Sequence, residues 1–157
     1  MAGRSVGLFR AALLERGLAD TIVELDASAR TAIDAAAALG CATGAIVKSL
    51  VFRGPGAEPL LVLGTGDGRV DEALVGERVG GPVALADAGF VRDAAGYAIG
   101  GVPPFGHRRD LPTLIDARLE RFALIWAAAG TPETVFSLSL QDLIHATGGE
   151  VVEVGRG

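Results

Sequence analysis

The chain has 157 residues, half of them hydrophobic, and carries a net charge of −5 at pH 7. This length suits one domain with a single core, and we expect residues 1–157 to form one unit. No apolar run approaches the ~20 residues that cross a bilayer, and the N-terminal segment lacks the pattern of an export signal. We therefore expect a soluble, cytoplasmic protein with no membrane partner.

One cysteine and two histidines exclude an internal disulfide and an ordinary zinc site, so we expect neither a metal nor a cofactor. The negative charge argues against a broad basic surface for nucleic acid, and we expect no DNA partner. Any contact with RNA has to be local. Positive charge concentrates in one stretch, which we interpret either as a solvated surface or as a phosphate contact. That stretch contains His107, Arg108, Arg109, Arg118 and Arg121.

Helical and strand patterns alternate in the first half of the chain. Thr31 has the side chain of a helix N-cap, and Gly40 ends the alanine-rich run that follows it. The turn Gly54-Pro55-Gly56 joins two apolar, β-branched runs into a hairpin. In chain order, the patterns predict a helix over 6–17, a strand over 21–25, a helix over 32–39, and hairpin strands over 45–52 and 59–63.

The second half mixes the same two patterns around an irregular segment. Asp71 and Ser139 are suited to open helices. Residues 96–110 contain four glycines and two prolines, which indicates an internal functional loop. The predicted elements are a helix over 71–79, a strand over 83–85, a helix over 86–95, strands over 113–116, 122–128 and 134–138, a helix over 139–147, and a strand over 151–154. These elements predict an α+β fold with a mixed sheet.

Lys48 is the only lysine among fourteen basic residues, and it falls in the middle of a predicted strand. Alternation along that strand places it on one face with Ile46, Leu50 and Phe52. Burying an ammonium group without a partner costs several kcal/mol. Lys48 therefore either extends its amine to water or presents it to a polar cavity.

The segment Gly100-Gly101-Val102-Pro103-Pro104-Phe105-Gly106 is the second unusual feature. Adjacent glycines allow a ligand to approach the main-chain N–H groups, and the prolines limit the accessible dihedral angles. Such a loop suits a carbonyl oxygen or a phosphate, although many loops of this composition are simple turns. Its spacing matches neither a Walker phosphate loop nor a Rossmann fingerprint.

The two features form part of a longer ordered pattern of residues. It consists of Gly44 to Phe52, Tyr97 to Gly106, Asp116, Leu119, Ala128-Ala129-Gly130 and Leu143. This pattern resembles the YbaK/EbsC family of aminoacyl-tRNA deacylases, also called the prolyl-tRNA-synthetase-associated domain, and the resemblance covers nearly the whole chain.

The resemblance implies an α+β fold with a mixed, curved, partly barrel-like sheet and flanking helices. It also implies hydrolysis of mischarged aminoacyl-tRNA in trans. The implied partners are the acceptor end of aminoacyl-tRNA and, as a further candidate, an aminoacyl-tRNA synthetase. Lys48 matches the family's essential lysine, and Gly100 with Pro104 matches its Gly-x-x-x-Pro loop. Many relatives have Ser or Thr where this chain has Pro103, which leaves the amino acid open among Cys, Ala and other small residues.

An aminoacyl ester is already activated, so an editing site mainly orients it and stabilises the oxyanion. We expect the Gly100 and Gly101 N–H groups to face the ester carbonyl. Lys48 is expected to neutralise the terminal phosphate or the developing charge, or, as a second option, to act as a base.

Four further residues are candidates for contact with substrate. Ile46 and Phe105 either shape the pocket or pack in the core. His107 follows the glycine loop directly and is placed to touch substrate. Asp116 either positions Lys48 or a water molecule, or caps a helix.

Two other functions remain open. A non-catalytic module would recognise an aminoacyl-tRNA end or a synthetase and would bind without turnover. A Schiff-base enzyme would use Lys48 as a nucleophile towards a carbonyl metabolite.

Overall fold

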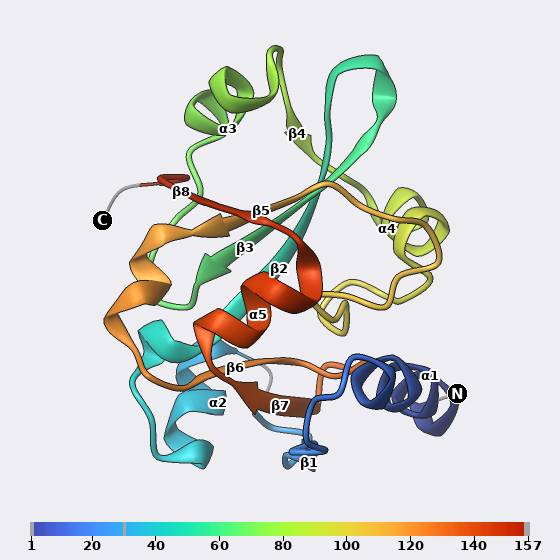
Figure 1. Cartoon of the computed structure of the whole chain (residues 1–157), viewed down its shortest axis with the longest axis vertical. Helices are drawn as coiled ribbons and strands as arrows, with labels where there is room; N and C mark the ends of the chain where they lie inside the picture. The colour runs from blue at the N-terminus through green and yellow to red at the C-terminus, as the bar shows by residue number, and fades with distance from the viewer. Residues whose placement is uncertain (1, 30, 156–157) are drawn as a thin grey trace.

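The structure is a computed structural model that describes residues 2–29 and 31–155. Its larger sheet has the strand order β4–β2–β3–β5–β8 (Figure 1). β2 pairs antiparallel with β3 and β4, whereas β5 runs parallel to both β3 and β8. The sheet is therefore mixed, as the sequence predicts. Its strands are β2 (Val47–Arg53), β3 (Pro59–Thr65), β4 (Ala84–Leu85), β5 (Thr113–Asp116) and β8 (Glu150–Val152).

A smaller antiparallel sheet has the order β1–β7–β6. One parallel bridge, between Ile46 and Trp126, joins the two sheets. The α+β class with a mixed sheet is therefore confirmed. Neither sheet closes on itself among the described residues, so the predicted barrel-like closure is not observed. The strands of the smaller sheet are β1 (Val23–Glu24), β6 (Ile125–Ala128) and β7 (Thr134–Leu138).

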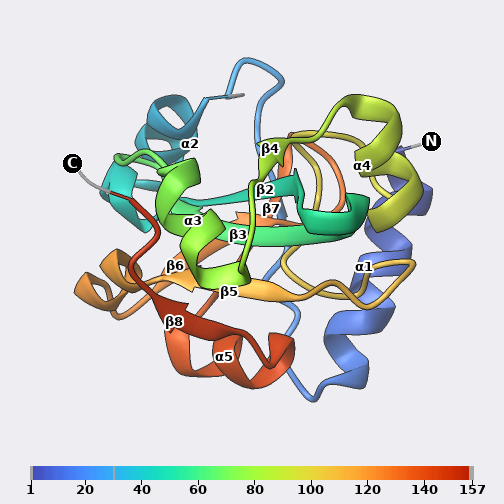
Figure 2. The ribbon, with the colours of Figure 1, turned by 90° about the horizontal axis from the view of Figure 1, so that it is seen from above.

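Five α-helices in the described part of the chain surround the sheets, and α1 and α2 lie at opposite sides of the molecule in both views (Figures 1 and 2). The helices are α1 (Ala2–Glu15), α2 (Ala32–Leu39), α3 (Glu72–Val79), α4 (Ala88–Ala95) and α5 (Leu140–Thr147). None of them combines the length and the apolar character that a bilayer crossing requires. Short 3₁₀ turns occupy Thr43–Ala45, Pro55–Ala57 and Ala117–Arg121.

The helix boundaries follow the capping chemistry of the sequence. Thr31 accepts a hydrogen bond from the Asp34 N–H, and Gly40 ends α2 with a φ of 71°. Asp71 and Ser139 cap α3 and α5 in the same way. The predicted start of α1 at residue 6 is four residues late, because the apolar spacing marks only the buried turn around Phe9 and Leu13.

The larger sheet is covered on both faces, and β2 shows the alternation that the sequence predicts. Val47 and Val51 belong to the main core cluster, which α1, α4 and α5 help to form. Leu50 and Phe52 pack in a second cluster with residues of α3. Several predicted strands are shorter than expected, and β1 and β6 differ most. Only Val23–Glu24 pair within 21–25, and residues 122–124 precede β6.

Candidate functional site

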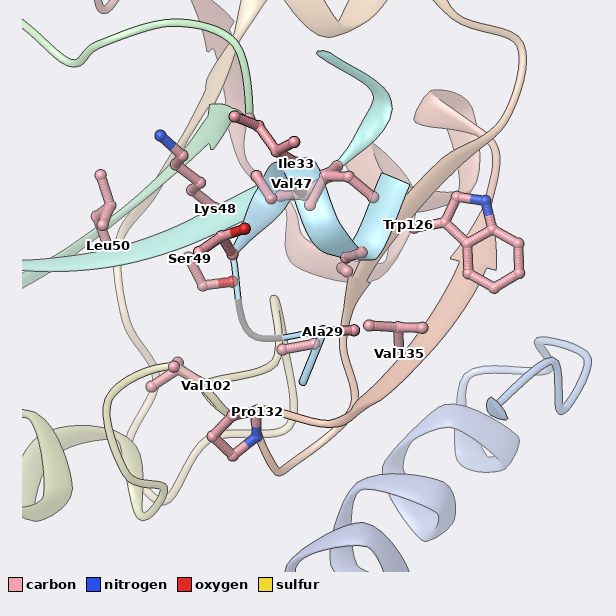
Figure 3. Close-up of a pocket in the computed structure, with 18 of the residues that line it drawn as sticks. Ala29, Ile33, Val47, Lys48, Ser49, Leu50, Val102, Trp126, Pro132 and Val135 are labelled. Carbon is pink, nitrogen blue, oxygen red and sulfur yellow. The ribbon is translucent and has the colours of Figure 1, made fainter. Parts of the chain in front are cut away.

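The structure contains a cavity of about 520 Å³ beside the first half of β2 (Figure 3). This volume is within the range of small-molecule sites. The start of α2, the loop before Val102 and strands β6 and β7 complete its walls. The lining is Ala29, Thr31, Ala32, Ile33, Ala35, Ile46 to Leu50, Gly66, Ile99, Gly100, Val102, Trp126 to Ala128, Pro132 and Val135.

The cavity is open because β2 lacks a neighbour along part of its outer edge. At one end Ile46 bridges to Trp126, and at the other Phe52 pairs with Leu85 of β4. Ser49 lies between these two contacts. No strand among the described residues covers this edge, so a ligand in the cavity meets the side of a strand.

Lys48 lines this cavity and is partly buried, and it forms no ion pair with another described residue. Its side chain leaves β2 on the face opposite to that of Ser49 (Figure 3). Since β2 is an edge strand at this point, the two side chains flank the open edge from either side. A ligand bound across this edge can therefore contact both side chains.

A glycine lies beside Lys48 on the neighbouring strand. Lys48 pairs with Gly64, and the adjacent pair of β3 and β5 is Leu63 with Ile115. A Cβ at Gly64 would lie 4.0 Å from Asp116 Oδ2, which places Asp116 beyond that glycine. The sheet thus brings Lys48 and Asp116 to one face on either side of Gly64, over which the Val70 side chain packs, with Cγ2 3.3 Å from the position of that Cβ.

Asp116 is nevertheless bound to another partner and does not line the cavity. It is 1% exposed and accepts hydrogen bonds from Arg118 Nε at 3.0 Å and Nη2 at 2.7 Å. It also accepts from the Arg118 main-chain N–H, which makes it the N-cap of the 3₁₀ turn. This supports the capping interpretation, and the hydrogen bond to Asp116 raises the pKa of Arg118 above its ordinary value.

The two glycines of the loop have different roles. Gly100 lines the cavity with a φ of +90°, a left-handed conformation that suits glycine. Gly101 is buried, and its N–H donates to the Ala98 carbonyl at 3.0 Å. The expectation that both N–H groups face a substrate is therefore wrong for Gly101, because its N–H closes a turn.

Pro104 and Phe105 are buried away from the cavity. Phe105 is 3% exposed, and its ring centroid lies 5.2 Å from that of Phe9 and 5.8 Å from that of Phe136. Pro104 is also buried and does not line the cavity. The interpretation of Phe105 as a core residue is the one that the geometry supports, whereas Ile46 is buried and lines the cavity.

His107 lies in a different hollow, which Tyr97 and Arg108 also line. Its Nε2 donates to the Pro103 carbonyl oxygen at 2.6 Å. Burial is the main cause that lowers the pKa of His107, and this hydrogen bond partly opposes it. His107 therefore stabilises the loop through its hydrogen bond to Pro103, and it does not line the cavity with Lys48.

The arginines that are close in sequence do not form one basic patch. Arg121 pairs with Asp67, and this contact lowers the pKa of the Asp67 carboxyl. The exposed Arg109 lies 3.6 Å from Glu58. Each of these guanidinium groups has a carboxylate neighbour, which favours the solvated-surface interpretation over a single phosphate site.

Sequence reasoning missed most of the cavity wall, including Ser49, Trp126 and two exposed isoleucines. Ile33 and Ile99 are 69% and 54% exposed at the cavity. Their exposure depends on long-range packing and has no local signal. The one sequence feature that pointed to Ser49 as a site residue is its position next to Lys48. Within residues 2–29 and 31–155 no group of three His, Cys, Asp or Glu side chains is placed to hold a metal.

The fold and the cavity together define an α+β domain with a ligand-sized pocket at the open edge of its mixed sheet. Residues 26–146 match the profile of the aminoacyl-tRNA editing domain, and the chain belongs to this family. The resemblance to the YbaK-type family that the sequence motifs indicate is thereby confirmed.

Individual proteins show the same relationship. A crystal structure of a protein described as a proposed trans-editing enzyme for prolyl tRNA synthetase is 42% identical, with a TM-score of 0.93 over 98% of each chain. The crystal structure of hypothetical protein APE2540 is 29% identical, with a TM-score of 0.87 over 95% of this chain and 99% of that one. Protein YwhH of Bacillus subtilis (strain 168) is 30% identical over 122 residues, which is 78% of each chain.

Proposed function

We propose that this protein hydrolyses, in trans, the ester that joins a wrongly attached small amino acid to tRNA. Cys or Ala on tRNA(Pro) is the substrate type that the family resemblance favours. The observation that supports this most is the arrangement of one pocket, in which Lys48 and Ser49 flank an open strand edge near Gly100. Membership of the aminoacyl-tRNA editing domain family supports the same chemistry.

The composition of the pocket bears on the mechanism. Lys48 is the only ionisable side chain among the described residues that line it. An activated ester needs no protein nucleophile, because water or the neighbouring ribose hydroxyl can attack it. In this proposal Lys48 stabilises negative charge on the terminal phosphate or the oxyanion. The Gly100 N–H is the remaining loop donor for the ester carbonyl.

The same set of lining residues also favours one alternative function, a binding module without catalytic activity. The described lining offers no carboxylate or histidine as a general base, and no described residue forms an ion pair that would orient Lys48. A binding module that recognises an aminoacyl-tRNA end would need neither. The two functions differ in turnover, so a kinetic experiment separates them.

The test is deacylation of a panel of mischarged tRNAs by the native protein and by Lys48→Ala. Loss of a well-placed charge-stabilising group typically costs 100-fold or more in rate, so we expect a fall of about 100-fold. Arg53→Ala is the matched control, since it removes an exposed cation of the same strand outside the cavity. Binding of the panel without hydrolysis by native protein would support the binding module. Full activity in Lys48→Ala would refute the assignment of Lys48.

A further inference from the structure

The Ser49 hydroxyl is a polar atom in a mostly apolar pocket. Its oxygen is buried and has no hydrogen-bond partner among the described residues. Around the same space lie Ala29, Val102, Pro132 and Val135 (Figure 3). An unpaired buried hydroxyl is unfavourable because it has lost its hydrogen bonds to water, and such groups in native proteins usually have a partner. A bound ligand is a natural partner here because the atom lines a cavity.

The main-chain N–H and C=O groups of Ser49 point to the outer edge of β2, beside the cavity. Along an antiparallel strand, successive residues direct their N–H and C=O groups alternately to one neighbour and then to the other. The Ile46 carbonyl accepts from the Gly66 N–H, on the β3 side, whereas the Val51 carbonyl accepts from the Ala86 N–H, on the β4 side. Ser49 is two residues from Val51, so its N–H and C=O point away from β3.

Among the described residues, the N–H and C=O groups of Ser49 have no hydrogen-bond partner. The outer edge of β2 has partners at Ile46 and from Val51 onwards, and none of the described hydrogen bonds on this edge involves the Ser49 N–H or C=O. Ser49 therefore offers two oxygen acceptors, its carbonyl and its Oγ, to one small pocket. Its neighbour Lys48 is a cation and cannot accept a hydrogen bond.

We propose that Ser49 binds the α-ammonium group of the aminoacyl ester, with its carbonyl oxygen and Oγ as acceptors. This inference rests on the proposed function and deepens it, because it defines the substrate class as esters with a free α-amino group. The ammonium group supplies N–H donors that match both oxygens, and hydrogen bonds to a charged group are the stronger kind. The amino-acid side chain then lies against the apolar wall.

A selection rule follows from this contact. An ester whose α-amino group is acylated or replaced by a hydroxyl keeps one N–H or O–H donor and no positive charge, so one of the two Ser49 oxygens stays unpaired. A site built to bind a polar group rejects analogues that cannot satisfy it. Peptidyl and N-acylated tRNAs are therefore excluded by the same residue that anchors a free aminoacyl group. Such a rule would spare the esters that translation itself uses as peptidyl donors.

The experiment compares esters on the same tRNA, one with an α-amino group, one with an α-hydroxyl group in its place, and one that is N-acetylated. Native protein, Ser49→Ala and the distant control Ser5→Ala are assayed for kcat/KM. We expect native protein and Ser5→Ala to prefer the α-amino ester by about ten-fold or more. Ser49→Ala removes Oγ but keeps the main-chain carbonyl, so this preference should shrink by about three-fold or more, mainly through loss of activity on the α-amino ester.

A binding measurement keeps the inference testable if native protein hydrolyses nothing. Non-hydrolysable 3′-aminoacylamino-3′-deoxyadenosine and its α-hydroxy counterpart are titrated against the same three proteins. Tighter binding of the amino form by native protein, weakened in Ser49→Ala but not in Ser5→Ala, supports the Ser49 contact even where the hydrolytic function has failed. Equal binding of the two forms by native protein overturns it. Equal kcat/KM losses on the amino and hydroxy esters in Ser49→Ala also overturn it, since they indicate a structural role.

Discussion

The packing of the glycine loop allows a quantitative test that is independent of any substrate. A Cβ added at Gly101 would lie 2.7 Å from Thr131 Cα and 2.8 Å from the Gly130 carbonyl oxygen. Both neighbours are main-chain atoms of a buried turn, so neither can move aside as a flexible side chain would. Gly101→Ala is thus a case of overpacking, which costs about 1–3 kcal/mol.

That free energy converts to a measurable shift in thermal unfolding. For a chain of this size 1 kcal/mol corresponds to about 2–4 °C in Tm, so Gly101→Ala should lower Tm by about 2–12 °C. Gly7→Ala is the matched control, because it makes the same chemical change in α1, where nothing lies within 4 Å of the added Cβ. Replacing a helical glycine by alanine should raise stability by about 0.5–1 kcal/mol.

Circular dichroism melts of the two variants and the native protein decide the matter. A Tm for Gly101→Ala equal to or above the native value, with Gly7→Ala behaving as expected, would refute the close packing of the loop on the 130–131 turn. If the loss in Tm is observed, the same variant is suited to a deacylation assay. The displaced loop carries Gly100, so its activity should fall further than its stability alone explains.

Two further predictions concern charged groups outside the cavity. Because burial lowers the pKa of His107, the unfolded chain binds this proton more readily, so stability should fall as the pH drops through about 6.5 and recover above it. His107→Gln should flatten that part of the curve in urea unfolding between pH 5 and 8, and an unchanged slope would contradict the role of burial. Asp116→Ala leaves Arg118 without its buried partner and should lower the free energy of unfolding by about 2–4 kcal/mol, a value reduced for the partial exposure of Arg118. Asp67→Ala removes an exposed ion pair and should cost less than about 1 kcal/mol, so similar costs for both variants would argue against a special role of burial at Asp116.

The elements that the sequence predicted best are those with a local chemical signal. Thr31 and Gly40 bound α2 as expected, and Thr113–Asp116 and Thr134–Leu138 form strands with the predicted limits. Capping and alternation are properties of neighbouring residues, so they can be inferred without the tertiary structure. The predicted loop over 96–110 likewise contains no helix or strand beyond the end of α4.

The candidate site was predicted in part, and its errors have one cause. Lys48, Ile46 and Gly100 do line a common cavity, whereas Phe105 and His107 follow the glycines in sequence but turn away from it. The prediction assumed that residues close to the glycines in sequence are also close to the cavity in space. In an irregular loop, consecutive residues can face opposite sides, and the direction of each is set by the elements it packs against.

Ser49 illustrates what depends on the whole fold. The sequence places a serine in a strand, and alternation assigns its side chain to one face. Whether its main-chain groups are paired depends on which strands occupy the outer edge of β2. That edge is bridged by Trp126 at one end and covered by Leu85 at the other, residues 77 and 36 positions away along the chain from Ser49. The gap between these two contacts makes Ser49 a ligand-facing residue, so an unpaired strand edge in a pocket is informative about function only once the strand order is known.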